Sequence, residues 1–74
     1  MNRYTIDVSL IEELQMINNK EALNKIFFKA TERIVGGDEV ILGRITKGGM
    51  QAFDSITTEA DLAAYKERVF KYLK

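Results

Sequence analysis

Cysteine and histidine are both missing from this sequence of 74 residues. Without cysteine no disulfide can form, and without either residue the usual ligands of a zinc site are lacking. The commonest catalytic nucleophiles and general bases are lacking for the same reason. These absences argue against a disulfide scaffold, a zinc domain and most nucleophilic enzymes.

Long apolar runs are also missing. No stretch approaches the ~20 apolar residues of a membrane span, and the amino-terminal segment MNRYTIDVSL lacks the apolar region of a secretory signal. We therefore expect a cytoplasmic protein without a membrane segment. The 11 basic and 11 acidic residues leave a formal net charge of +0, so no overall field attracts nucleic acid.

The length predicts a single domain over residues 1–74, and 46% hydrophobic with 30% charged residues is an ordinary globular balance. A chain this short buries only about 60% of the surface that its unfolded state exposes. Small domains usually gain support from disulfides, a metal or a second subunit. With the first excluded and the second disfavoured, self-association is the expected support.

The first elements follow from alternation and capping patterns. YTIDV alternates apolar and polar residues, which predicts a strand over residues 3–8. Ser9 and Glu12 have the spacing of a capping box. They predict a helix over residues 10–17 whose inward side chains are Leu10, Ile11, Leu14 and Ile17.

The next helix has signals at both ends. Asn18 can end the first helix in a left-handed conformation, and Asn19 can cap the second. Gly36 and Gly37 provide the stop, which predicts a helix over residues 20–35. Its inward stripe consists of Leu23, Ile26, Phe27, Ala30 and Ile34.

The second half predicts a hairpin and a final helix. EVILGRI is rich in β-branched residues and indicates a strand over 39–46, and KGG indicates a turn. The return strand is expected over 50–54, although its composition also permits a helical turn. Thr58 and Asp61 have capping-box spacing, so the last helix begins there and runs almost to Lys74. Its main inward side chains are Leu62, Tyr65, Val69, Tyr72 and Leu73.

These elements predict an α+β fold in the order βααββα. A small three-stranded, mainly antiparallel sheet would pack with three helices. No repeat, linker or low-complexity segment interrupts the chain.

No motif indicates catalysis. The acids cluster near helix starts, where they complement the helix dipole. Asp38 and Glu39 follow a glycine pair but lack the spacing of a calcium loop. Lys47 precedes Gly48 and Gly49, whereas a P-loop lysine follows the glycines. We therefore expect no enzyme activity, no cofactor and no metal site.

Two adjacent phenylalanines pose a geometric question. Side chains of neighbouring helical residues point about 100° apart, so Phe27 and Phe28 cannot face the same core. Phe28 and Val35 form a second, narrower apolar strip on their helix, and Ala63 and Phe70 form one on the last helix. Either Phe28 and Phe70 pack inside one chain, or one or both strips close against a second copy.

We favour the second reading. It predicts a non-catalytic interaction or regulatory domain that forms a homo-oligomer, most simply a dimer, with an interface that includes Phe28 or Phe70. A different protein is the other partner that these strips would suit.

A nucleic-acid-binding regulator is the alternative. It would use Arg44 and Lys47 beside the glycine turn, together with the basic end of the last helix: Lys66, Arg68, Lys71 and Lys74. Cations at a helix carboxyl end also stabilise the helix, so this cluster has a structural explanation as well. The second helix offers a poor recognition face, because Glu21 and Glu32 interrupt its basic residues.

Overall fold

The computed structural model describes residues 2–73. The elements along the chain are β1 (Arg3–Asp7), α1 (Val8–Met16), α2 (Lys20–Val35), β2 (Glu39–Thr46), β3 (Gly49–Ile56) and α3 (Glu59–Lys71). The α+β class and the βααββα order predicted from the sequence are confirmed.

The sheet is mixed, with β2 in the centre between β1 and β3. β1 runs parallel to β2, with Tyr4 opposite Val40, and β3 runs antiparallel to β2, with Ile56 opposite Val40. The expected mainly antiparallel sheet is therefore correct only for the hairpin. The other pair is parallel because α1 and α2 together form the long crossover that returns the chain to the start of the sheet.

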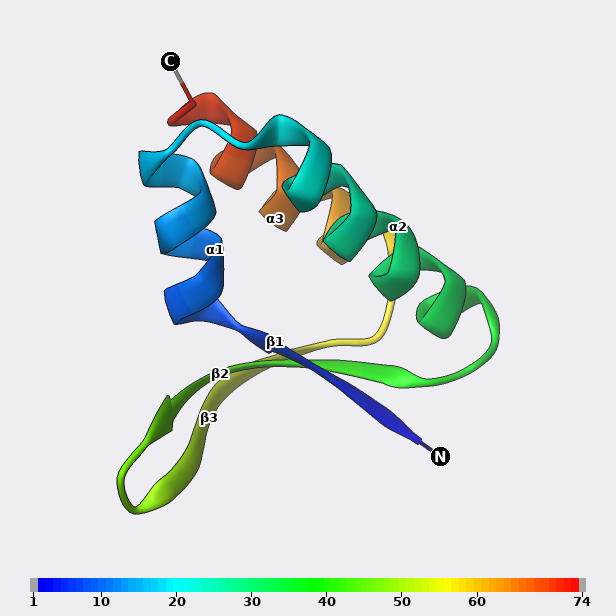
Figure 1. Cartoon of the computed structure of the whole chain (residues 1–74). Coiled ribbons are helices and arrows are strands. Elements are labelled where there is room, and N and C mark those ends of the chain that lie inside the picture. Colours follow the sequence, from blue (N-terminus) through cyan, green and yellow to red (C-terminus); the bar gives the residue numbers. More distant parts are fainter. Residues whose placement is uncertain (1, 74) are drawn as a thin grey trace.

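All three helices lie on one face of the sheet (Figure 1). The sheet side chains Ile6, Val40, Leu42 and Ile56 pack against them in one buried cluster. Ile41 lies between Val40 and Leu42 and points to the opposite face, because successive strand residues alternate. That face is not covered by any helix among residues 2–73.

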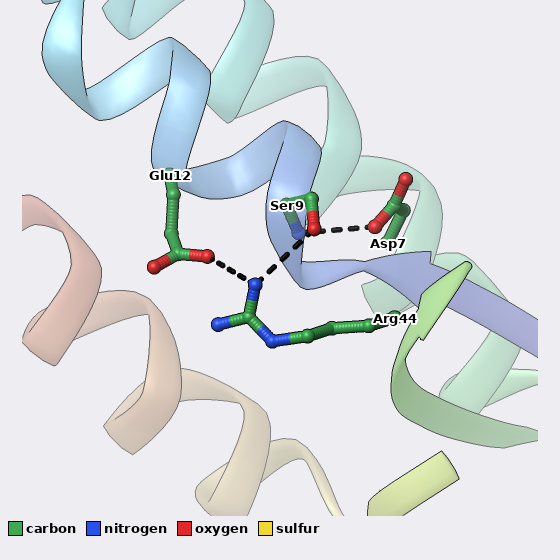
Figure 2. Close-up of polar contacts among 4 residues, drawn as sticks. All are labelled: Asp7, Ser9, Glu12 and Arg44. Atoms are coloured by element: carbon green, nitrogen blue, oxygen red, sulfur yellow. Dashed lines mark hydrogen bonds and ion pairs between the residues drawn. The ribbon is translucent and has the colours of Figure 1, made fainter. Parts of the chain in front are cut away.

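The start of α1 differs from the prediction. Asp7 is the capping residue, and its Oδ1 accepts a hydrogen bond of 3.0 Å from the backbone N–H of Ser9 (Figure 2). The predicted Ser9–Glu12 capping box is wrong because the chain passes directly from β1 into the helix, which places Ser9 inside the first turn. Leu10 and Ile17, expected to face inward, are 43% and 68% exposed.

Both ends of α2 match the sequence signals. Asn18 has a φ of 56°, and the Asn19 side chain accepts a hydrogen bond of 3.1 Å from the N–H of Ala22. At the other end Gly36 stays helical with a φ of −77°, and Gly37 takes the left-handed conformation with a φ of 92°. Local signals therefore determine the limits of this helix.

The hairpin is formed as predicted, and residues 50–54 are strand rather than helix. Thr46 pairs with Gly49, whose φ of 118° turns the chain. The Thr58 hydroxyl caps α3 by accepting a hydrogen bond from the N–H of Asp61. Tyr72, predicted to face inward, follows the end of α3 and is 72% exposed.

We predict that Gly37→Ala lowers the free energy of unfolding by about 1 kcal/mol, because an alanine at positive φ is strained. Gly36→Ala is the matched control, since its backbone is already helical and a Cβ there would meet the nearest atom at 3.4 Å. Urea unfolding measures both variants. Equal stability of the two would contradict the assignment of the left-handed stop to Gly37.

Candidate interaction surface

Helices α2 and α3 lie side by side above the sheet (Figure 1). Phe27 is 1% exposed, and its ring centroid lies 5.6 Å from that of Tyr65 and 6.1 Å from that of Phe70. Together with the buried Leu23, Ala30 and Ile34, this aromatic contact fixes the rotation of α2 about its own axis. The residue after Phe27 must therefore point out of the core.

Phe28 does point outward and is 68% exposed. It lines an open groove of about 870 Å³ whose walls are mainly polar and charged side chains of α2, with Lys66 contributed by α3. Val35, on the same side of α2, is also 68% exposed. The predicted second strip of α2 is therefore uncovered within residues 2–73.

The strip predicted on α3 is different. Phe70 is half-buried against Phe27, and the Nζ atom of Lys66 lies 5.5 Å from the centroid of the Phe70 ring. Ala63 is exposed. Of the predicted interface residues, Phe70 thus packs within its own chain, whereas Phe28, Val35 and Ala63 remain accessible.

Two further groups of exposed apolar side chains were not predicted from the sequence, and two of their members, Ile17 and Tyr72, were predicted to face inward. Ile45, Met50 and Phe53 on the hairpin are 67%, 45% and 58% exposed. Met16, Ile17 and Tyr72 are exposed at the ends of α1 and α3. Their periodicity resembles that of core residues, and only the packing shows that nothing within residues 2–73 covers them.

Arg44 is engaged by α1. Its Nη1 atom donates to Glu12 Oε1 at 2.7 Å and to Ser9 Oγ at 3.2 Å (Figure 2). The hydrogen bond with Glu12, and next its negative charge, raise the pKa of Arg44 above its ordinary value. Arg44 therefore joins β2 to the start of α1.

The other cations of the nucleic-acid alternative lie on more than one side of the molecule, although Arg68 and Lys71 share one side of the last turn of α3. Lys66 and Arg68 lie about 160° apart around α3, and the Arg68 guanidinium lies 5.8 Å from the centre of the Tyr65 ring. Burial raises the pKa of Tyr65. Lys71 lies in the last turn of α3, Lys47 follows the end of β2, and Lys74 lies outside the described residues.

Residues 2–73 contain neither a cluster of metal-ligating side chains nor a helix that could cross a membrane. No group of three or more Asp, Glu, His or Cys side chains is placed to hold a metal ion. No helix combines the length and apolar character needed to cross a membrane.

Comparison with known proteins gives no match. The chain fits no protein-family model, and no curated protein or solved structure matches it.

We predict that the two phenylalanines differ in their effect on stability. In dilute solution, Phe70→Ala should lower the free energy of unfolding by about 1–3 kcal/mol, because it removes a half-buried ring from Phe27. Phe28→Ala should change it by less than about 0.5 kcal/mol, since the ring is mostly exposed. Thermal unfolding followed by circular dichroism measures both, and a larger loss for Phe28→Ala would contradict the placement of that ring.

Proposed function

We propose that this chain is a small, non-catalytic interaction domain that self-associates, most simply as a dimer, through the face of α2 and α3 around Phe28. The observation that carries the proposal is the exposed Phe28 ring in an open groove along α2, with Lys66 of α3 at its side. Val35 and Ala63 extend this accessible face.

The make-up of the face supports the proposal. Protein interfaces commonly have an aromatic or apolar centre and a polar rim. Here Phe28 forms the centre, and Glu21, Lys25, Glu32 and Lys66 stand around it. The charged rim can stay hydrated in the separate chain, and the apolar centre can be buried when two chains associate.

The size of the chain supports it as well. A sequence of 74 residues with no cysteine has a small core and no disulfide to reinforce it. Burying one phenylalanine side chain contributes about 1.5–3 kcal/mol, and a symmetric contact buries two. Pairing of two Phe28 side chains is therefore a substantial source of stabilisation.

We predict that Phe28→Asp converts the dimer into a monomer with unchanged helix content, because the new carboxylate would be buried in the interface. Sedimentation velocity at high micromolar concentration measures the assembly, and circular dichroism measures the fold. Phe53→Asp is the matched control, since Phe53 is a similarly exposed phenylalanine, 58% accessible, on the hairpin.

Two results would contradict the proposal. The first is a wild-type protein that sediments as a monomer at high micromolar concentration. The second is an assembly that survives Phe28→Asp and dissociates with Phe53→Asp, which would assign the interface to the hairpin.

A further inference from the structure

We propose that the second copy docks with its α2 antiparallel to α2 of the first, about a two-fold axis close to Phe28, so that Lys25 of each chain pairs with Glu32 of the other. This inference rests on the proposed self-association and specifies its geometry. It follows from the positions of charged residues along and around one helix.

The two charges lie on the same flank of Phe28. At about 100° per residue, Glu32 lies about 40° and Lys25 about 60° around the helix from Phe28, in the same direction. Both side chains are exposed and both line the groove around the Phe28 ring. Neither takes part in an ion pair within residues 2–73.

Their heights along the helix are matched. At about 1.5 Å per residue, Lys25 lies about 4.5 Å from Phe28 toward the amino end and Glu32 about 6 Å toward the carboxyl end. A two-fold axis perpendicular to an antiparallel pair exchanges the two directions and keeps each flank on its own side. Lys25 of one chain therefore meets Glu32 of the other at nearly the same height, and symmetry makes two such pairs.

A parallel arrangement lacks this match. It would place each charged flank against the opposite flank of the partner, which carries Asn24 and Thr31, about 40° and 60° from Phe28 in the other direction. Lys25 would then face Asn24, and Glu32 would face Thr31, at similar heights. Only the antiparallel arrangement brings Lys25 of one chain against Glu32 of the other.

The other flank of Phe28, which carries Asn24 and Thr31, suits the same antiparallel pairing. It places Asn24 of each chain beside Thr31 of the other, on the side of α2 that faces α3. The Thr31 hydroxyl already donates a hydrogen bond of 2.9 Å to the carbonyl of Phe27, so its oxygen is left as an acceptor for the Asn24 amide. The interface would have Phe28 at its centre, the Lys25–Glu32 pairs on one flank, and Asn24 and Thr31 on the other, with Lys66 of α3 beside them.

The edge of β3 is the competing surface for a second copy. The pairing partner changes from Asp54 to Ala52 between Leu42 and Gly43, which leaves Phe53 as an extra, unpaired residue in the strand. A bulge of this kind interrupts an edge and limits the addition of another strand. The α2 face has no such interruption.

Charge reversal tests the pairing directly. Lys25→Glu and Glu32→Lys should each weaken dimerisation about tenfold at low salt, because each change replaces two attractive pairs with two repulsive ones. The double variant Lys25→Glu with Glu32→Lys restores opposite charges and should recover the dissociation constant to within about threefold of wild type. The effects of the single changes should shrink in 1 M salt.

The control carries the same charge changes elsewhere. Glu13→Lys with Lys47→Glu alters exposed residues of α1 and the hairpin turn, and should leave dimerisation unchanged singly and together. Circular dichroism and thermal melting confirm that each variant is folded. Sedimentation equilibrium over a concentration series gives the dissociation constants.

The outcomes separate this inference from the proposed function. Loss in both single variants with recovery in the double variant supports the antiparallel pairing. A dimer that is lost with Phe28→Asp but unaffected by the single reversals, or not recovered in the double variant, overturns the pairing and retains the self-association. A wild-type monomer overturns both.

Discussion

Burial of Phe27 is the contact from which the rest of the surface follows. Its ring lies among Tyr65, Phe70 and the sheet residues of the core cluster, and it holds α2 at one rotation against α3. Because the next residue on a helix points about 100° away, the same contact directs Phe28 into solvent. The sheet occupies only one side of the helix layer (Figure 1), so no strand among residues 2–73 reaches the other side to cover that ring.

The one-sided arrangement also limits how much apolar surface the chain can bury. Ile6, Val40, Leu42 and Ile56 meet the helices, whereas the opposite sheet face meets none of the helices of residues 2–73. Apolar side chains consequently remain exposed on α2 and on the hairpin. The exposed side chains of α2 are the ones that the proposed self-association would bury.

Charge distinguishes one of these surfaces from the others. The net charge is +0, so no overall field directs binding, and the positions of individual charges become decisive. Arg44 and Glu12 form an ion pair within the chain, and this pair joins β2 to α1. Lys25 and Glu32 have no such partner within residues 2–73, and their spacing about Phe28 is complementary to itself under a two-fold rotation.

The sequence by itself determined the features that depend on a few neighbouring residues. Asn18, Asn19 and Gly37 set the limits of α2, the turn before Gly49 set the hairpin, and the adjacency of Phe27 and Phe28 required one ring to leave the core. These signals are readable because capping bonds, positive φ angles and helical periodicity act over short spans. The α+β class follows from them.

Only the tertiary structure decided the contacts between distant segments. It made β1 parallel to β2, placed Phe70 against Phe27 rather than in solvent, and joined Arg44 to Glu12. It also turned β1 into α1 without a loop, so that Asp7 and not Ser9 caps the helix. These outcomes depend on which surfaces meet when the helices pack against the sheet. Hydrophobic periodicity in the sequence shows that one face of an element is buried, but it does not show which distant segment packs against that face.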